Sequence, residues 1–479
     1  MEVTSLNDVI LDKRKNLQHQ LYQQISTKII NGELTCGMKL PSSRQLAQDL
    51  SIGRNTVVKA IEQLCDEGYL YSRRGSGVYV NEAINESSIK FAQQQSSDQL
   101  PLPKLSQYAQ SLAHLTKDNS ENLPFSPGLT AIDEFPIAIW QRLTRRHGDR
   151  TLLFGYNGVQ GYLPLREALA NYLAHSRGVK CDASQVIITQ GAQQAISLCA
   201  QVLLNHHDQV IVEEPGYGSA KNAFLAYQAQ LLTVGLQQES IDVASLKQQQ
   251  YNDAKLLYCT PTHQYPMGGI LPASDRLALL DWASKNNTWI IEDDYDSEFH
   301  FNQKPVAAIQ GLAETTPVIY MGSFSKTLFA SLRLGYLVVP KAIVNQFVSV
   351  KNAMSGETPL LLQATVTDFI NEGHFARHLR RMRVSYQKKW QHFNALLAQL
   401  SPHCQVVAQS AGMHLVVKIP NIDDIALKQY ILKHGFAVSP LSLYYLNPTV
   451  ETGLTIGFAN TTSEQRLEMV RLIKQFIAL

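Results

Sequence analysis

VIYMGSFSKTLFASLRLGY, at residues 318–336, reads as a buried strand that ends in a Ser-x-Ser-Lys loop. Ser323 and Ser325 precede Lys326 in this loop, and Arg333 follows the lysine by seven residues. An amine at a strand end can condense with an aldehyde, and nearby hydroxyl and guanidinium groups can bind a phosphate. The stretch therefore predicts a site for a small molecule that carries both an aldehyde and a phosphate.

Similar apolar runs occur upstream and alternate with amphipathic stretches. Five of them read as buried strands: VIIT (186–189), VIVEE (210–214), LLYCT (256–260), WIIEDD (289–294) and VIYMGS (318–323). Helical patterns at 192–204 and 274–286 lie between several of these runs. Such alternation predicts an α/β domain whose mostly parallel sheet is covered on both faces. After residue 340 we expect long helices, such as 375–400, and a small α+β piece that begins at 413–419.

Two further motifs favour binding of a phosphorylated ring. TQGAQQA follows a predicted strand and opens a helix, where the backbone N–H groups of Gly191, Ala192 and Gln193 would form an anion site. EEPGYGSA supplies Tyr217, which can stack on the face of a ring or can equally be a core tyrosine. Turns of the first kind are common in α/β proteins, so neither motif identifies a ligand alone.

An acidic motif, WIIEDDYDSEF, ends another predicted strand. We assign Asp293 to the pyridine nitrogen of the ring, since a buried carboxylate there keeps the nitrogen protonated and makes the ring an electron sink. Tyr295 would point toward the ring hydroxyl. A metal site is the alternative for an acidic cluster, but no His or Cys is spaced to complete one, and we predict no metal. With Lys326 and its loop, these features predict pyridoxal 5′-phosphate (PLP) as the cofactor.

The first eighty residues have a different pattern. Leu21, Ile25 and Ile29 repeat at helical spacing, and two shorter helical stretches, 44–50 and 54–68, follow across a turn that contains Gly53. Two short helices joined by such a turn form the helix-turn-helix motif. GYLYSRRGSGVYV then reads as two short strands around a basic tip, which is a wing.

Basic and polar residues stand where this motif meets DNA. A recognition helix places its N-terminal residues at base edges in the major groove, and arginines and lysines contact phosphates and purine edges. The residues at these positions are Arg54, Asn55, Thr56 and Lys59 on the second helix, Arg44 on the first, and Arg73 and Arg74 in the wing. The alternative is a solvated helical hairpin whose arginines bind nothing.

Composition supports a globular protein with separate domains. The chain has 479 residues with 45% hydrophobic and 17% charged residues, and its net charge of +2 gives no global reason to bind nucleic acid or membrane. Residues 82–122 are rich in Gln, Ser, Asn and Pro, as linkers are. We therefore predict a DNA-binding domain at 1–81, a linker at 82–122 and a ligand-binding domain at 123–479.

The location follows from what the chain lacks. We find no apolar run long enough for a transmembrane helix, and the first residues do not resemble a signal peptide. The six cysteines are scattered without a CxxC pair, which favours reduced, mostly buried thiols. We expect a cytoplasmic protein without a membrane partner.

LPSSRQLAQDLSIGRNTVVKAIEQLCDEGYLYSRRGSGVYV, at 40–80, resembles the winged helix of the GntR family of bacterial transcription regulators. The resemblance covers nearly all of 17–80. It implies that double-stranded operator DNA is the partner. The contacts that it implies fall on Ser43, Arg44, Arg54, Asn55, Thr56 and Gly77, with the arginines beside that glycine.

Residues 123–479 resemble fold type I aminotransferases, through the motifs above and through four more: GYNGVQGYLPLREALANYL (155–173), YCTPTHQYPMGGILP (258–272), EGHFARHLRRMR (372–383) and TIGFAN (455–460). The two resemblances together are those of the MocR/GabR-type regulators. These are dimeric transcription factors that bind PLP and sense a ligand through the aminotransferase fold. The resemblance also implies that His263 or Gln264 contacts the ring hydroxyl side and that Tyr156 reaches the cofactor phosphate of a partner subunit.

One position departs from the family pattern. Many relatives carry an arginine that binds a ligand carboxylate where this chain has Leu443, and a leucine cannot offer that bidentate fork. Either another cation, such as Lys221, holds the carboxylate, or the effector is PLP itself rather than an amino acid.

Two other functions remain open from the sequence. The chain can be a working aminotransferase with an appended DNA-binding module, since Lys326, Asp293 and Arg333 are all present. It can also be a DNA-binding protein whose large domain only dimerises. We predict a PLP-dependent regulator in which ligand binding changes the fit of two winged helices to two half-sites.

Overall fold

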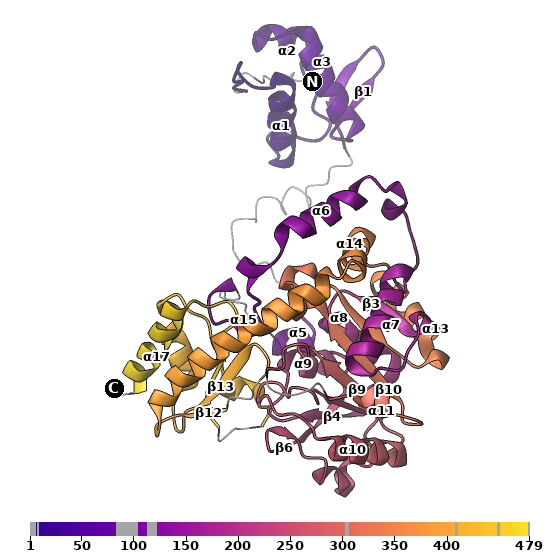
Figure 1. Ribbon diagram of the computed structural model, residues 1–479. Coiled ribbons are helices and arrows are strands. Elements are labelled where there is room, and N and C mark those ends of the chain that lie inside the picture. The colour runs from indigo at the N-terminus through magenta and orange to yellow at the C-terminus, as the bar shows by residue number, and fades with distance from the viewer. Residues whose placement is uncertain are drawn as a thin grey trace. The chain divides into compact units, whose positions relative to one another are not determined.

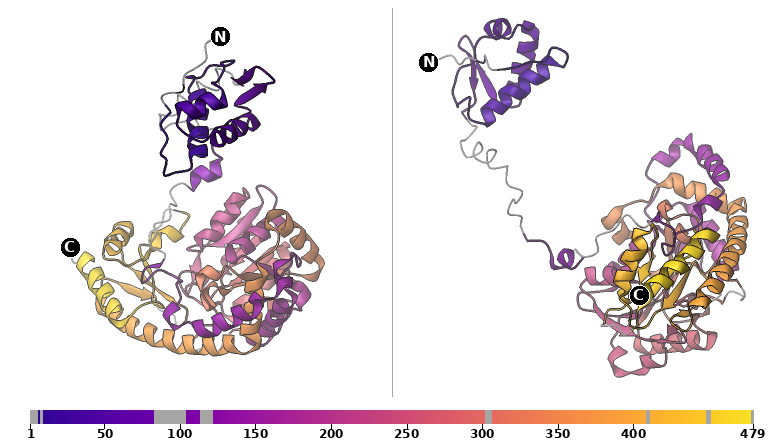
Figure 2. Two further views of the ribbon diagram at one scale, coloured as in Figure 1. Left: turned by 90° about the horizontal axis from the view of Figure 1, so that it is seen from above. Right: turned by 90° about the vertical axis from the view of Figure 1, so that its left-hand side faces the viewer.

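The computed structural model describes residues 6, 9–82, 104–112, 122–301, 306–407, 411–447 and 451–477 (Figures 1 and 2). The chain divides into two compact units, Met1–Ser106 and Gln107–Leu479. Most of the predicted linker lies outside the described residues, and its described part includes the short helix α5 (Gln107–Ser111).

The small unit is a winged helix. Its helices are α1 (Leu17–Ile30), α2 (Ser43–Asp49) and α3 (Arg54–Asp66), and its wing pairs β1 (Leu70–Arg73) with β2 (Gly77–Val80) in antiparallel register. Ser42 caps α2 by accepting a hydrogen bond from the Gln45 N–H. The apolar faces of the three helices meet in one buried cluster that includes Leu21, Leu46 and Val57. The predicted winged helix is confirmed.

The large unit is built on a sheet of seven strands in the order β3-β11-β10-β9-β8-β4-β5. The neighbours from β10 to β5 run parallel, whereas β11 is antiparallel to both β10 and β3. The strands are β3 (Val186–Thr189), β4 (Gln209–Glu213), β5 (Gln230–Val234), β8 (Leu256–Cys259), β9 (Trp289–Asp294), β10 (Val318–Ser323) and β11 (Gly335–Val338). The prediction of a mostly parallel sheet is confirmed. β5 and β11 were not among the predicted strands.

Helices cover both faces of this sheet, which is why its central strands are apolar without alternation. Side chains of α8, α9 and α13 pack on one face, and those of α7, α10 and α11 pack on the other. The bounds of these helices are α7 (Leu163–Arg177), α8 (Ala192–Leu203), α9 (Gly218–Ala226), α10 (Ala273–Asn286), α11 (Ile309–Leu312) and α13 (Val344–Ser355).

The C-terminal part of the large unit forms an α+β end piece, as predicted. Its antiparallel sheet has the order β12-β13-β15-β14, with strands β12 (Gln405–Val407), β13 (His414–Lys418), β14 (Ser439–Pro440) and β15 (Gly453–Gly457). The long helix α15 leads from the larger sheet to this piece (Figure 1). The remaining helices are α6 (Ile137–Gly148), α12 (Phe324–Thr327), α14 (Leu360–Asn371), α15 (His374–Leu397), α16 (Asp424–Lys433) and α17 (Ser463–Ile477), and β6 (Leu236–Gln237) pairs with β7 (Ser240–Ile241).

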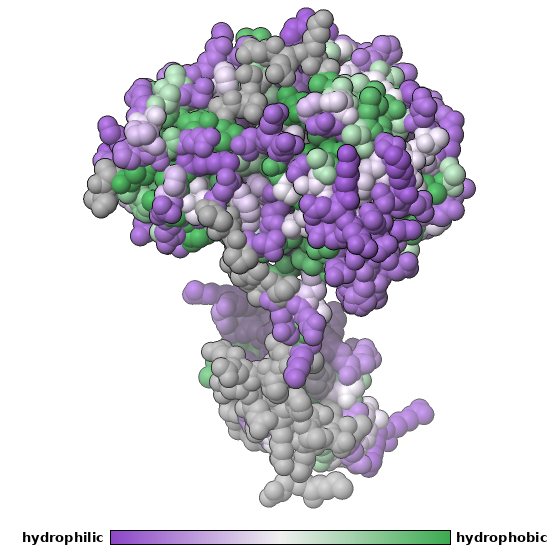
Figure 3. All heavy atoms as spheres, turned by 90° about the horizontal axis from the view of Figure 1, so that it is seen from below, coloured by the Kyte–Doolittle hydropathy of each residue, from purple (hydrophilic) through white to green (hydrophobic). Residues whose placement is uncertain are grey.

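The surface and the thiols are those of an ordinary globular fold. Figure 3 shows polar residues over much of one face, with smaller apolar patches between them. No helix in the described ranges is long and apolar enough to cross a membrane. Cys199, Cys259 and Cys404 are buried free thiols, whereas Cys36 is exposed, so the thiols are less uniformly buried than we expected.

Candidate cofactor site and DNA-binding surface

Strand register brings the predicted phosphate-binding residues to one edge of the sheet. Gly335 of β11 lies opposite Thr189 of β3 on one side and opposite Ser323 of β10 on the other. The loop after β3 and the loop after β10 are therefore neighbours, although they are far apart in the sequence. The residues that meet here are Gly191, Ala192, Gln193, Ser323, Ser325 and Arg333, which we call the phosphate cradle.

Several groups of this cradle suit an anion. Gly191 precedes α8 with a φ of 90°, and the first N–H groups of a helix have no partner within it. The exposed guanidinium of Arg333 lies near this turn, because a Cβ built on Gly191 would be 3.4 Å from the guanidinium carbon. The Ser323 hydroxyl accepts a hydrogen bond from the Ser325 N–H at 3.2 Å and caps α12. The cradle thus combines a helix start, two hydroxyls and a cation.

Lys326 lies on α12, half-buried, and its Nζ donates to the Gly128 carbonyl at 3.0 Å. Burial lowers the pKa of this amine, and the nearby Asp296 and Asp293 carboxylates oppose the shift. A lowered pKa increases the share of neutral, nucleophilic amine. Gly128 has a φ of 80°, and a Cβ there would lie 1.9 Å from the Lys326 Nζ, so a side chain at this position would displace the end of the lysine from its present place.

Asp293 is 4% exposed at the end of β9. Its Oδ2 accepts from the Tyr258 hydroxyl at 2.5 Å, whereas its buried Oδ1 has no hydrogen-bond partner in the part of the chain that is described. Burial raises its pKa to about 7, the Tyr258 hydrogen bond opposes the rise, and Asp294 and Asp296 add to it. An orphaned buried carboxylate oxygen fits a pyridinium N–H, which would supply the missing hydrogen bond and a compensating charge.

His263 and Tyr295 form a second polar group beside Asp293. The His263 Nδ1 lies 3.0 Å from Asp296 Oδ2 and 2.8 Å from the Tyr295 hydroxyl. A Cβ on Gly412 would lie 2.2 Å from the His263 ring, so this glycine permits the close approach. Gln264, the alternative to His263, instead donates its amide to the backbone of Pro215 and of Tyr265.

Tyrosines line the remaining side. Tyr217 is half-buried, and its ring lies edge-on to that of Tyr265 at a centroid distance of 5.5 Å. Lys221 is buried, and its Nζ donates to the Tyr444 carbonyl at 2.6 Å. Burial lowers the pKa of this lysine to about 8, although Glu214 and Glu213 oppose the shift. Leu443 is 60% exposed.

Among the described residues, no group of His, Cys, Asp or Glu side chains is arranged to hold a metal ion.

An exposed segment of the large unit carries Tyr156. Its side chain is 99% exposed, next to Leu152 at 83% and Phe154 at 68%. Several exposed large apolar side chains close together are typical of interaction surfaces.

The predicted DNA-binding residues lie on α2, on the first turns of α3 and in the wing of the small unit. Arg44, Arg54, Asn55, Lys59, Arg73 and Arg74 are exposed, and Ser43, Thr56 and Gly77 are half-buried. A hollow of about 370 Å³ separates the start of α3 from the start of α1, and it is lined by Asn55, Thr56, Lys59, Lys15, Asn16, Leu17 and Gln18. In the wing, the Arg73 guanidinium lies 5.3 Å from the centre of the Tyr71 ring.

Sequence reasoning missed several of these residues. Asp296 holds His263, Tyr258 donates to Asp293, and Lys15 lies beside Lys59 only because the tertiary fold brings them together. The acidic run DDYD gave a signal for Asp296, and the motif YCTPTHQYPMGGILP begins at Tyr258 without marking that residue, whereas nothing near Lys15 in the sequence pointed to a site.

The buried acids predict how the stability of the cofactor-free protein depends on pH. Burial raises the folded-state pKa values of Asp293, Glu213 and Glu298 to about 7. Below pH 7 these carboxyl groups hold protons in the folded state that the unfolded state has already lost. Their loss as the pH rises from 6.5 to 7.5 should therefore lower the free energy of unfolding. Urea unfolding at several pH values measures this, and Glu213→Gln should make the slope shallower.

Other titrating groups act mainly below or above this window. Burial lowers the pKa of His300, His378 and His414 from 6.5 to about 4, which adds stability as the pH rises through 6.5 and offsets part of the fall at the lower edge of the window. Burial also lowers the pKa of Lys221 and of Lys351 to about 8, which adds stability only above that pH. A stability that rises steadily between pH 6.5 and 7.5 would contradict the prediction.

Comparisons with known proteins agree with this division of the chain. The family of bacterial regulatory proteins named gntR matches residues 17–80, and the family of class I and II aminotransferases matches residues 130–473. A Rhizobium meliloti protein named as a probable rhizopine catabolism regulatory protein, MocR, is 36% identical over 98% of this chain and 96% of its own. The pyridoxine biosynthesis transcriptional regulator PdxR of Corynebacterium glutamicum is 27% identical over 92% of this chain and 91% of its own.

Among solved structures, a kynurenine aminotransferase from Pyrococcus horikoshii superimposes on the chain with a TM-score of 0.70. It is 25% identical and covers 81% of this chain and 98% of its own.

Proposed function

The chain belongs to the MocR/GabR-type transcriptional regulators, which join a gntR-family helix-turn-helix domain to an aminotransferase class I and II domain, and from this premise we propose that it senses PLP bound at Lys326. The observation that carries the proposal is the buried, unpartnered Oδ1 of Asp293, in the same unit as a phosphate cradle and a partly desolvated lysine. These three features match the ring nitrogen, the phosphate and the aldehyde of PLP.

Each part of the site has its own task in this proposal. The phosphate cradle binds the phosphate, Lys326 binds the aldehyde carbon, and Asp293 keeps the ring nitrogen protonated. PLP, when bound, supplies an electrophilic carbon and an electron-accepting ring. Asp296 holds the His263 imidazole, which together with Tyr295 orients the ring hydroxyl. Tyr217 covers the ring face.

We propose that the signal is PLP rather than an amino acid. Lys221 is the cation that we considered as a substitute for the missing arginine, and its Nζ already donates to a backbone carbonyl. Leu443 is apolar and exposed, so its side chain provides neither a positive charge nor a hydrogen-bond donor for a carboxylate. A relative named for the regulation of pyridoxine biosynthesis is consistent with a vitamin B6 signal.

The acting form in this proposal is a cytoplasmic homodimer on double-stranded operator DNA. The exposed group of Leu152, Phe154 and Tyr156 suits contact with a second copy, whose cofactor phosphate Tyr156 would reach. Two copies present two winged helices, whose Arg54, Asn55 and Thr56 read one half-site each. PLP changes the affinity for DNA if it binds more tightly to one of two dimer states that differ in their fit to DNA. A difference of about 1–3 kcal/mol between its binding free energies for the two states suffices for a switch.

Two measurements on the full-length protein test this function. Adding PLP should produce the visible absorbance band of a lysine-bound cofactor, and it should change the affinity for the upstream region of the gene in a gel shift at stated salt. An amino-acid panel added afterwards should leave the band unchanged. A protein that stays colourless with PLP would refute the cofactor, and multiple turnover with an amino donor and a keto acid would favour an active aminotransferase.

A further inference from the structure

The segment that carries Tyr156 is held in place by side chains from a distant part of the sequence. Residues 155–162 connect η3 (Thr151–Phe154) to α7, and we call them the tyrosine loop. The side chains that hold the loop come from α13, from the turn after α13 and from α14. None of them belongs to the phosphate cradle.

Glu357 binds the loop directly beside the tyrosine. Its half-buried carboxylate accepts hydrogen bonds from the Asn157 N–H at 2.9 Å and from the Gly158 N–H at 2.8 Å, one on each oxygen. Hydrogen bonds to an ionised acceptor are about twice as strong as those between neutral groups. One side chain therefore fixes the two residues that follow Tyr156.

Two further side chains hold the rest of the loop. Lys351 is 0% exposed, and its Nζ donates to the Val159 carbonyl at 2.5 Å and to the Gly356 carbonyl at 3.1 Å. The amide oxygen of Gln363 accepts a hydrogen bond from the Tyr162 N–H at 2.8 Å. These contacts hold the loop along most of its length.

The loop is also fixed to the strand and the helix that carry the phosphate cradle. The Ile188 N–H of β3 donates to the Gln160 carbonyl at 2.9 Å. The Gln194 amide of α8 donates to the Ser355 hydroxyl at 2.6 Å, two residues before Glu357. The position of the tyrosine loop is therefore set by the same elements that position the cradle.

This anchoring does not bury the large side chains of the segment. Tyr156 is 99% exposed, and Phe154, just before the loop, is 68% exposed. Fixing an exposed backbone segment costs conformational entropy, which burial of its large side chains would normally offset. A segment that is fixed beforehand, with its tyrosine exposed, loses less entropy when that tyrosine makes a contact with another molecule.

We propose that Glu357 is a positioning residue, which fixes Tyr156 so that its hydroxyl binds the cofactor phosphate of a second copy. The inference rests on the proposed function, from which it takes the cofactor and the dimer. A phenol hydroxyl can donate one hydrogen bond to a phosphate oxygen. Pyridoxal lacks the phosphate and offers Tyr156 no such acceptor, so a comparison of the two ligands separates positioning from a general effect on the fold.

The test measures the dissociation constants of PLP and of pyridoxal for the full-length protein, by absorbance. Glu357→Ala removes the hydrogen bonds to the loop, Glu357→Gln keeps the size of the side chain without its charge, and Tyr156→Phe removes the hydroxyl. Urea unfolding and sedimentation show whether each variant folds and assembles as wild type does. If Glu357→Ala does not fold, the comparison is made with Glu357→Gln.

Glu357→Ala should weaken PLP binding roughly tenfold and leave pyridoxal binding unchanged. Ordering one backbone residue corresponds to a factor of about 5 to 30 in an equilibrium constant, and a hydrogen bond to a charged group to a factor of about 10 to 150. Tyr156→Phe should show the same difference between the ligands. Adding Glu357→Ala to it should cause little further loss, because both changes remove the same contact.

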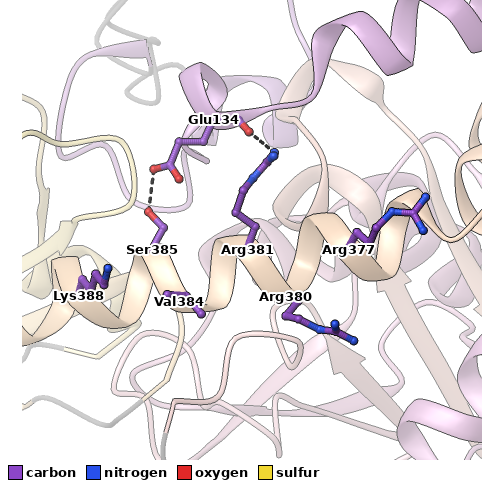
Figure 4. A pocket seen from close by; sticks show the side chains of 7 residues that line it. All are labelled: Glu134, Arg377, Arg380, Arg381, Val384, Ser385 and Lys388. Atoms are coloured by element: carbon purple, nitrogen blue, oxygen red, sulfur yellow. Dashed lines mark hydrogen bonds between the residues drawn. The ribbon is translucent and has the colours of Figure 1, made fainter.

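Glu134→Ala is the matched control. Glu134 is also half-buried, and its carboxylate accepts hydrogen bonds from the Ser385 hydroxyl at 2.7 Å and from the Lys389 Nζ at 3.0 Å. Figure 4 shows that Glu134 faces α15, and it makes these contacts there rather than with the tyrosine loop. The control should bind both ligands as wild type does.

Equal weakening of PLP and pyridoxal binding in Glu357→Ala would overturn the inference, and so would wild-type affinity for PLP in that variant. A Tyr156→Phe protein that binds PLP like wild type would also overturn it. A failure of the proposed function gives a different result, because wild type itself would then stay colourless with PLP.

Discussion

Lys326→Ala is expected to abolish the visible absorbance that PLP gives when it is bound through a lysine. Lys326 lies on α12 beside the phosphate cradle, and its Nζ donates to the Gly128 carbonyl, in a position that leaves it partly desolvated. Without this amine no covalent link to the aldehyde can form. Absorbance spectra of the purified variant after addition of PLP measure the loss directly.

The same variant should no longer change its DNA affinity when PLP is added. Lys285→Ala is the control, because Lys285 is an exposed lysine of α10 that pairs only with Asp281 across one helical turn. The control should keep both the absorbance and the PLP response. A lysine-bound spectrum that survives in Lys326→Ala would place the link on another lysine.

Asp293→Ala should weaken PLP binding by a larger factor than any other change that spares the lysine. The pyridinium would lose a charged partner in a buried site, a loss of about 3–5 kcal/mol, or a factor of roughly 150 to 4,000 in affinity. Equilibrium titration with PLP, followed by absorbance or by tryptophan fluorescence, gives the dissociation constant. Asp293→Asn should also weaken PLP binding, because a neutral amide cannot balance the positive charge of the pyridinium.

The cofactor-free protein should respond in the opposite way. Asp293 has a buried oxygen that finds no hydrogen-bond partner in the described part of the chain, and burial raises its pKa, so the site disfavours the charged form. We therefore expect Asp293→Asn to unfold at the same or a higher urea concentration than wild type at pH 8. Tyr258→Phe removes the donor to Asp293 and should reduce PLP affinity much less. An Asp293→Asn protein that binds PLP like wild type would refute the role of this carboxylate.

Much of the fold could be predicted because its signals are local. Five buried strands between 186 and 323, the helices α8 and α10 and the wing follow from apolar periodicity and turn residues within short windows, whereas β5 gave no such signal. β11 was missed because it has only four residues and follows directly on the loop that carries Lys326. Its place between β3 and β10 depends on pairing with strands that are distant in the sequence.

The same distinction holds for the candidate site. Lys326, Ser323, Asp293 and Gly191 each sit at the end of a predicted strand or the start of a helix, so the sequence alone could nominate them. Tyr258 and Gly128 stand at no such position. They matter because Tyr258 donates to Asp293 and Gly128 leaves space for Lys326.

The amino-acid sequence by itself determined that this chain holds a winged helix and a parallel α/β domain, and which loops carry the reactive groups. Hydrophobic periodicity, turn-forming residues and the ends of strands depend on residues that are neighbours in the sequence. They can therefore be recognised without knowing how distant segments pack. Only the tertiary structure decided that the Lys221 Nζ donates to a backbone carbonyl and that one oxygen of Asp293 lacks a hydrogen-bond partner among the described residues. Burial and pairing depend on what distant segments bring to the same place, and no local pattern records that.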